Sequence, residues 1–212
     1  MATILVTGAT GGLGRAVIEL ATRRGWNVLA PSRAECDTAS DASVRTYFEE
    51  HARSTDISAI VHLVGGIVAG RSVEETTDAD VEHMLSLNLV SAFNMVRHGM
   101  PILKARGGGA FVAIAAQAVL HPVGGRSAYA AAKAGVLSLM NSVAEEGRPW
   151  KVRANTIVPS IVRTEANLAW ADEDTAEGWV RPEQIADTIL HLCSPTCAVS
   201  GASIPMYGTY FE

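Results

Sequence analysis

The chain opens on Met1–Gly14, MATILVTGATGGLG, and this stretch predicts how the rest of the chain folds. An apolar run at positions 4–6 leads into Thr7, and glycines follow at positions 8, 11, 12 and 14. Apolar residues at helical spacing come next, with arginine and glutamate between them. A strand, a glycine-rich turn and a helix in this order are typical of the first βαβ unit of a dinucleotide-binding domain. Glycine lets a pyrophosphate approach the backbone, and the N–H groups of the helix N-terminus attract that anion.

Length and composition predict one α/β domain. The 212 residues are 48% hydrophobic and 18% charged, enough for one buried core and too few for two comfortable ones. We expect a single domain, 1–212, with a cofactor half of about 1–115 and a catalytic and substrate half of about 116–212. The net charge of −5 gives no reason to expect nucleic acid or a membrane surface as a partner. Three scattered cysteines, no apolar leader and histidines without ligand spacing predict a cytoplasmic protein without a metal.

Strand and helix patterns alternate along the chain. Strands are predicted at 27–31, 57–64, 110–115, 152–158 and 203–206, and helices at 41–53, 78–104, 127–146 and 182–193. Such alternation favours a doubly wound Rossmann fold, a mostly parallel sheet with helices on both faces. Only residues 32–40 separate the second strand from the next helix, so a third strand is expected as a vestige at 34–37.

Five motifs, in order and spread over nearly the whole chain, resemble those of the short-chain dehydrogenase/reductase family. They are the fingerprint Thr7-Gly8-x-x-x-Gly12-x-Gly14, Asn88, Tyr129-x-x-x-Lys133, Pro159 with Thr164, and Ser200-Gly201. The resemblance implies an oxidoreductase that uses a nicotinamide cofactor. It also implies a sheet of strand order 3-2-1-4-5-6-7, in which strand 3 is vestigial here. It also implies a homodimer or homotetramer that pairs the helices carrying Asn88 and Tyr129.

Tyr129 and Lys133 are the candidate catalytic pair. They are four residues apart, so they share one face of a helix. A nearby lysine cation lowers the pKa of a tyrosine, which then exchanges a proton with a carbonyl oxygen as hydride moves. The resemblance implies that Lys133 also bonds the nicotinamide ribose and that Asn88 supports a water chain from the lysine. The alternative is an exposed helical pair without chemistry.

The end of the second strand predicts which cofactor binds. Arg33 can pair a 2′-phosphate and Ser32 can donate a hydrogen bond to it, so we expect NADP(H) in preference to NAD(H). The alternative is that Arg33 is a solvated loop cation. The resemblance implies that Asp37 contacts the adenine amino group. The complete predicted cofactor set is Gly8, Thr10, Gly11, Gly12, Leu13, Gly14, Ser32, Arg33, Asp37, Val64, Gly65, Gly66, Tyr129, Lys133, Pro159, Ser160, Val162 and Thr164.

The chain departs from the family pattern in two places. The usual Asn-Asn-Ala-Gly turn is replaced by Leu63-Val64-Gly65-Gly66, so only backbone contacts are carried over. The family's catalytic serine lies about thirteen residues before the tyrosine, and that position is Ala116. Ser127 is too close to Tyr129 to replace it and is expected to cap the helix.

Three interpretations of Ala116 remain open. Tyr129 and Lys133 act alone on a substrate that needs little polarisation, as in the dihydropteridine reductases that this chain resembles in lacking the serine. Alternatively Gln117, the nearest side-chain amide, replaces the serine for an ordinary ketone or alcohol. Otherwise the protein binds NADP(H) with little or no turnover, as a sensor or scaffold. For a small-molecule substrate, the pocket walls are expected from 121–123, the loop after Pro159 and 167–179, with Leu168 and Trp170 as an apolar cover.

Overall fold

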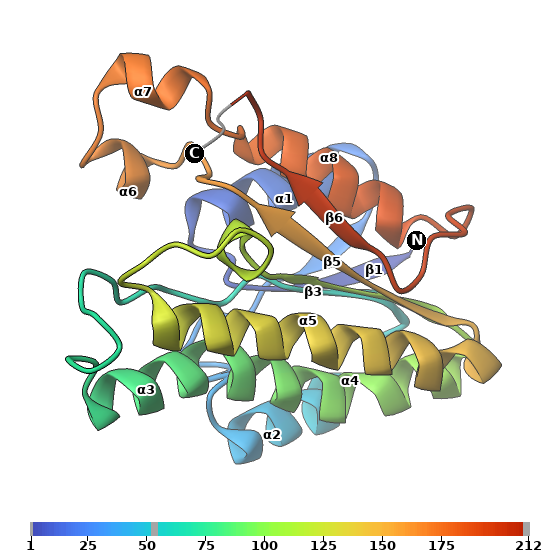
Figure 1. The fold of residues 1–212 in the computed structure, drawn as a ribbon. Coiled ribbons are helices and arrows are strands. Elements are labelled where there is room, and N and C mark those ends of the chain that lie inside the picture. Colours follow the sequence, from blue (N-terminus) through green and yellow to red (C-terminus); the bar gives the residue numbers. More distant parts are fainter. Residues whose placement is uncertain (1, 52–54, 210–212) are drawn as a thin grey trace.

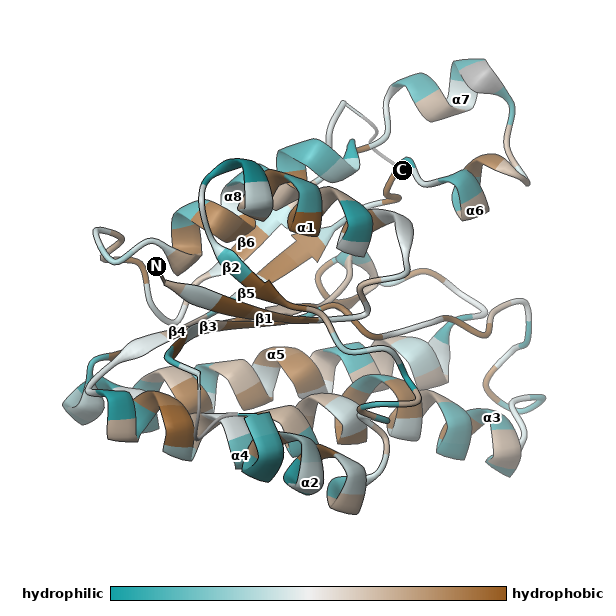
Figure 2. Cartoon of the chain, turned by 180° about the vertical axis from the view of Figure 1, so that it is seen from behind, coloured by the Kyte–Doolittle hydropathy of each residue, from teal (hydrophilic) through white to brown (hydrophobic). Residues whose placement is uncertain are grey.

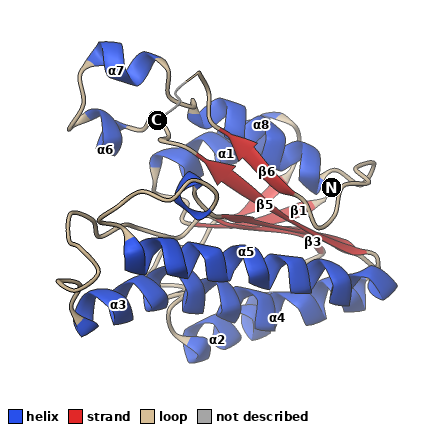
Figure 3. Cartoon of the chain, in the orientation of Figure 1, coloured by secondary structure: helices blue, strands red, loops and turns tan. Residues whose placement is uncertain are grey.

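The computed structural model describes residues 2–51 and 55–209. Its centre is one sheet of six parallel strands in the order β2-β1-β3-β4-β5-β6 (Figure 1, Figure 3). The strands are β1 (Thr3–Thr7), β2 (Asn27–Leu29), β3 (Ile57–His62), β4 (Gly109–Ile114), β5 (Val152–Pro159) and β6 (Ser203–Met206). The predicted single-domain doubly wound fold is therefore confirmed.

Helices cover both faces of the sheet. The α-helices are α1 (Gly12–Arg23), α2 (Asp41–His51), α3 (Asp78–Met84), α4 (Ser91–Arg106), α5 (Ser127–Gly147), α6 (Glu165–Leu168), α7 (Glu173–Glu177) and α8 (Pro182–Cys193). Figure 1 shows α1 and α8 on one face and α2, α4 and α5 on the other. A π-helical segment, Leu85–Val90, joins α3 to α4, and 3₁₀ turns lie at Gln117–Val119 and Arg148–Trp150.

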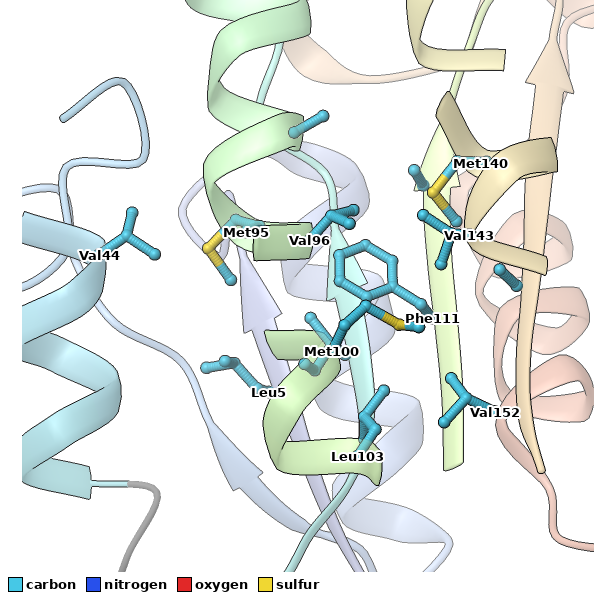
Figure 4. Close-up of a cluster of buried hydrophobic side chains, with 14 of the residues drawn as sticks. Leu5, Val44, Met95, Val96, Met100, Leu103, Phe111, Met140, Val143 and Val152 are labelled. Carbon is cyan, nitrogen blue, oxygen red and sulfur yellow. The ribbon is translucent and has the colours of Figure 1, made fainter. Parts of the chain in front are cut away.

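Two apolar cores hold these layers together, one on each face of the sheet. β1 and β3 are buried along their whole length, as expected for strands covered on both sides. In Figure 2 the strands are mostly hydrophobic, whereas hydrophilic residues appear on the outer sides of the helices. Figure 4 shows the core under α4 and α5, where Phe111 of β4 lies among Met95, Met100 and Met140. The second core joins β1, β3 and β4 to α1 and α8.

The predicted vestigial third strand is wrong. No described residue between β2 and α2 is in a strand, and β2 itself ends at Leu29 instead of Pro31. The backbone N–H groups of Glu35 and Cys36 both donate to the carbonyl oxygen of Ser32, which closes a turn there. Residues 32–40 are too few for both a turn and another strand, so β2 is an edge strand.

The helix predicted at 78–104 is interrupted in its middle. The side-chain amide of Asn88 donates to the carbonyl oxygen of Met84 at 3.1 Å, and the Ser91 hydroxyl donates to that of Leu87 at 2.6 Å. These side chains bond to backbone carbonyls along the π-helical segment 85–90, a distortion often found at functional sites. α4 then continues to Arg106, where Gly107 ends it in a left-handed conformation.

Three smaller predictions also need correction. Ser127 does not cap α5, because Arg126 is the N-cap residue, and the Ser127 hydroxyl lies 3.4 Å from that of Thr76. The strand predicted at 57–64 ends at His62, and the chain continues as the turn that holds Gly65 and Gly66. α2 is described to His51, and its predicted end at Arg53 lies outside the described residues.

Candidate active site

The strand order reverses between β1 and β3, and two hollows lie at this edge of the sheet. A crevice outside the carboxyl ends of strands at such a reversal is where doubly wound folds bind ligands. The first hollow, the Gly8 cleft, has a volume of about 310 Å³ and runs from residues 7–11 to residues 31–39. The second, the Tyr129 pocket, also has about 310 Å³ and lies beyond β4 and β5. Leu63 and Gly65 line both hollows, so one turn joins them.

The glycine loop presents the free end of α1 to the Gly8 cleft. A Cβ at Gly14 would lie 2.2 Å from the carbonyl oxygen of Gly8, so only glycine allows the loop to fold against the first turn. No side chain caps α1, and its first N–H groups have the orientation that suits an anion. Gly8, Thr10 and Gly11 line the cleft as predicted, and Gly12 opens the helix. The side chain of Leu13 packs against the core beside α8.

The far end of the Gly8 cleft is polar, and the sequence analysis missed the Glu35 carboxylate that bonds to Ser32 beside it. Ser32, Arg33 and Asp37 line it together with Val64 at the near end. The Arg33 side chain is 86% exposed, and its Nη2 lies 3.5 Å from Oδ2 of Asp37. Glu35 accepts a hydrogen bond from the Ser32 backbone N–H at 2.7 Å, and bonds from Ser32 lower the pKa of Glu35. The Ser32 N–H group is therefore already bonded to an anion of the protein itself.

Tyr129, Lys133 and Asn88 come together around the Gly65–Gly66 turn. Tyr129 and Lys133 line the same pocket, and Lys133 Nζ donates to the Ile114 carbonyl oxygen at 2.9 Å. Asn88 is buried; its amide donates to the Gly66 carbonyl oxygen at 3.0 Å and accepts from the Gly66 N–H at 3.2 Å. A Cβ at Gly65 would lie 2.8 Å from both Lys133 Nζ and Asn88 Oδ1. Glycine at 65 therefore leaves space where the lysine and asparagine meet.

The pKa values differ from the sequence expectation. Burial raises the pKa of Tyr129 to about 12, and the positive charge of Arg126 opposes this shift. Lys133 was expected to lower the pKa of the tyrosine, but its ammonium is directed to Ile114. Burial also lowers the pKa of Lys133 to about 8, since its charge is costly away from water. At neutral pH the phenol therefore keeps its proton and the lysine remains largely charged.

His62 joins the glycine loop to the π-helical segment, and no motif pointed to it. Its Nδ1 lies 2.8 Å from the Thr7 hydroxyl, and its Nε2 lies 3.2 Å from the Ser91 hydroxyl. The ring is buried, and burial together with the charge of Lys133 lowers the pKa of His62 to about 3. The imidazole is therefore neutral at working pH, with one ring nitrogen donating and the other accepting. The only sequence signal was a polar residue at the end of a largely apolar strand.

The predicted walls of the Tyr129 pocket are largely confirmed. His121, Val123, Asn167 and Trp170 line it, and so do Pro159, Ser160 and Val162 of the loop after β5. Ala116 and Gln117 line the same pocket as Tyr129. Leu168 does not line it, and the exposed Trp170 ring packs against the buried Trp179 ring at a centroid distance of 5.2 Å.

The segment after Thr164 is tied to the glycine loop. Thr164 caps α6, and the Asn167 amide donates to the Val162 carbonyl oxygen at 2.8 Å. Arg15 of α1 pairs with Glu165 of α6 at 2.8 Å. α6 and α7 stand beyond the carboxyl ends of β5 and β6 (Figure 1). Asn167 and Trp170 of this segment line the Tyr129 pocket, so residues 165–170 border that pocket.

Known proteins share this fold over nearly the whole of this chain. The profile of a family described as Enoyl-(Acyl carrier protein) reductase matches residues 2–208, and the chain belongs to this family of short-chain dehydrogenases/reductases. An acetoacetyl-CoA reductase from Synechocystis sp. is 29% identical over 98% of this chain and 95% of its own. A short-chain dehydrogenase/reductase structure from Burkholderia thailandensis is 26% identical, with a TM-score of 0.85 over 98% of this chain and 91% of its own. The protein is therefore an oxidoreductase of the short-chain type.

Two more distant structures share the fold with nucleotide bound. ElxO, solved with NADP, has a TM-score of 0.91 at 17% identity and covers 99% of this chain and 98% of its own. A 3-ketoacyl-(acyl-carrier-protein) reductase from Brucella melitensis, solved with NADH, has a TM-score of 0.89 at 19% identity. The match covers 98% of this chain and 97% of the reductase. The two neighbours differ in cofactor, so the likeness in fold leaves the preference of this chain open.

None of the described helices combines the length and the apolar composition needed to cross a bilayer. No three His, Cys, Asp or Glu side chains among the described residues are grouped so as to hold a metal ion. The three cysteines are free and buried, and burial raises the pKa of Cys193 to about 12.

Proposed function

We propose that this protein reduces a small carbonyl or quinonoid substrate with NADP(H), using Tyr129 as the proton donor. The observation that supports this most strongly is that Tyr129 and Lys133 line one pocket with the Gly65–Gly66 turn and the loop after Pro159. The bound cofactor would supply a hydride to the carbonyl carbon and leave in its oxidised form. Tyr129 gives its phenolic proton to the carbonyl oxygen, so the C=O bond becomes an alcohol, and solvent restores the phenol.

The other site residues hold this arrangement in place. We assign the nicotinamide ribose to Lys133, whose remaining ammonium protons are directed toward the Gly65 turn. Asn88 fixes that turn through its two bonds with Gly66. We propose that the loop after β5 holds the nicotinamide amide, through Pro159, Ser160, Val162 and Thr164. Because burial raises the pKa of Tyr129 to about 12, the phenol carries at neutral pH the proton that reduction requires.

For the cofactor we propose NADP(H) in preference to NAD(H). Arg33 lies at the rim of the Gly8 cleft, where its guanidinium can pair with a 2′-phosphate. Ser32 already donates to the carboxylate of Glu35, and a phosphate oxygen would take that place. We propose that Asp37 contacts the adenine amino group. Its Oδ1 also accepts a hydrogen bond from the Ala39 N–H at 3.1 Å.

A second candidate function is NADP(H) binding with little or no turnover. Ala116 favours it, because no hydroxyl at this position can bond a substrate carbonyl. Against it, the Tyr129, Lys133 and Asn88 set is complete, and pure binding does not require a proton donor. Gln117 in the same pocket can supply an amide donor, and a quinonoid pterin of the kind that dihydropteridine reductases use would need little polarisation.

The deciding experiment is an absorbance assay of NADPH oxidation with quinonoid dihydropterin, ketones, aldehydes and quinones. We expect at least one of these to be reduced and the rate to depend on Tyr129. Tight NADPH binding with no Tyr129-dependent oxidation of any substrate would support the binder instead. An Ala116→Ser variant reports on the missing hydroxyl: if ketone reduction rises strongly, the hydroxyl limits the natural protein.

We further propose a homodimer or homotetramer in the cytoplasm. A hollow of about 750 Å³ runs between α4 and α5, lined by Leu89, Phe93, Leu139 and Gly135 among others. Phe93 is 46% exposed there, and Gly135 lets α5 approach Leu89 closely. A second copy of this face would cover those apolar side chains. The buried, unpaired thiols are compatible with a reducing compartment.

A further inference from the structure

The Tyr129 pocket is positively charged, although the protein as a whole carries a net charge of −5. Among the described residues that line it, Arg126 and Lys133 are the charged side chains, and no carboxylate joins them. Lys133 is buried and donates to Ile114, which leaves Arg126 as the cation available to a substrate. A pocket of one charge sign concentrates ligands of the opposite sign.

Arg126 differs from most arginines of this chain in having no protein anion beside it. Within residues 2–51 and 55–209 its side chain forms no ion pair or hydrogen bond, whereas Arg15, Arg24, Arg97 and Arg106 each pair with a carboxylate. The residue is half-buried at the N-cap of α5, where a guanidinium needs a partner to replace lost water. A planar guanidinium binds carboxylates through two parallel hydrogen bonds.

The position of Arg126 relative to Tyr129 suits a role in substrate binding. It stands three residues before the tyrosine, and its charge acts on the phenol. Ile67, Val123 and Trp170 supply apolar walls on the same pocket, while Ala116 leaves room beside the carbonyl. A ligand that fits these features has a short hydrocarbon body, a carbonyl for Tyr129 and an anion for Arg126.

We propose that Arg126 binds a substrate carboxylate, so that the protein reduces small oxo acids to hydroxy acids. This inference rests on the proposed reductase function and names its substrate class. The carbonyl carbon gains the hydride and its oxygen gains the Tyr129 proton, while NADPH becomes NADP⁺. The carboxylate keeps its charge and all its bonds, and serves only to hold the substrate in place.

The test compares each of a set of oxo acids with its own methyl ester. The acids have four or five carbons and carry the carbonyl at position 2, 3 or 4. Each pair shares the reacting carbonyl and differs in charge. Three proteins are measured: the natural chain, Arg126→Gln and, as a matched control, Arg45→Gln. Arg45 is exposed on α2, lies outside the Tyr129 pocket, and loses the same charge when replaced.

We expect the natural protein to prefer at least one acid over its ester. Arg126→Gln should lower kcat/KM for that acid by about ten- to a hundredfold, mainly through KM, as loss of a charge-assisted bond implies. Its effect on the ester should be smaller by about threefold or more, because the ester loses only the influence of the Arg126 charge on Tyr129, and Arg45→Gln should change neither. Equal use of acid and ester, or an unchanged preference in Arg126→Gln, would overturn the inference while leaving the reductase function intact.

A binding measurement separates the two proposals. Calorimetric titration of the NADPH-bound protein with butanoate and with butanamide reports on Arg126 without any turnover. Butanoate should bind more tightly than butanamide, and Arg126→Gln should remove the difference. If that pattern appears but no acid, ester, ketone, aldehyde, quinone or quinonoid dihydropterin is reduced, the reductase function fails and the anion site stands. If butanoate and butanamide bind alike, the anion site fails.

Discussion

At the residue scale, His62 connects the two halves of the site through its side chain. It bridges Thr7, directly before the glycine loop, and Ser91, directly after the π-helical segment. A protonated ring would lose its acceptor, and its charge would be buried near Lys133. The folded state therefore requires a neutral His62.

This requirement predicts a loss of stability in acid. The pKa of His62 is 6.5 in an unfolded chain and about 3 in the folded one. Between these two pH values the unfolded state binds a proton at His62 that the folded state does not. The contribution of His62 to the stability of the fold is therefore complete above pH 6.5 and falls as the pH drops toward 3. The slope approaches about 1.4 kcal/mol per pH unit.

Denaturant unfolding from pH 8 to pH 4 checks this for the natural protein, His62→Gln and a control, His191→Gln. His191 is exposed at the end of α8. The advantage of the natural protein over His62→Gln should shrink as the pH falls, whereas the His191→Gln curve should run parallel to it. Parallel curves for all three would show that His62 is not held neutral.

Glu35 makes a second prediction at this scale, about cofactor choice. Its carboxylate occupies the Ser32 N–H that we assign to the 2′-phosphate. Glu35→Gln removes the repulsion and should tighten NADPH binding by about two- to tenfold with little change for NADH. Arg33→Ala should weaken NADPH binding alone. Fluorescence titrations with both cofactors measure this, with exposed Glu49→Gln as the control. Equal effects on NADH and NADPH would count against the phosphate assignment.

At the scale of elements, the first turn of α1 depends on a contact that excludes any side chain. A methyl group at Gly14 would meet both the Gly8 oxygen and the backbone of Ala9, within 2.2 Å and 2.8 Å. Gly14→Ala must therefore move the loop away from the helix and spoil the anion site. The expected loss in NADPH affinity is about tenfold or more, which equals about 1.4 kcal/mol.

The matched control for Gly14→Ala is Gly124→Ala, because a Cβ at Gly124 would meet no atom within 4 Å. Gly124→Ala should leave NADPH affinity unchanged. Isothermal titration with both variants gives the comparison. Normal NADPH binding by Gly14→Ala would mean that the loop shown here is not the one that holds the pyrophosphate.

At the scale of the whole molecule, the sequence predicted what depends on local spacing. Tyr129 and Lys133 share a face because four residues make about one helical turn, and the strands were found because their apolar runs are buried on both sides. Individual side-chain contacts were missed. His62 reaches Ser91 across the fold, Glu35 bonds to the backbone of nearby Ser32, and Asn88 and Ser91 bond to backbone carbonyls at a π-helical segment in a pattern that looked like one continuous helix.

Assembly also belongs to this scale. If two copies pair through α4 and α5, a carboxylate at position 93 would lose water on pairing and would replace the apolar surface of Phe93, and both effects weaken the dimer. Sedimentation velocity should show a smaller species for Phe93→Glu than for the natural protein. Val73→Glu, at a residue that is 73% exposed away from this face, is the control. A monomeric natural protein would contradict the proposed pairing.

The central claim is that Tyr129 delivers a proton beside a bound nicotinamide. The most direct measurement is single-turnover NADPH oxidation by the natural protein and by Tyr129→Phe, with NADPH affinity measured on both. The account predicts equal NADPH binding and a rate for Tyr129→Phe that is lower by about a hundredfold or more. Equal rates in the two proteins would contradict it.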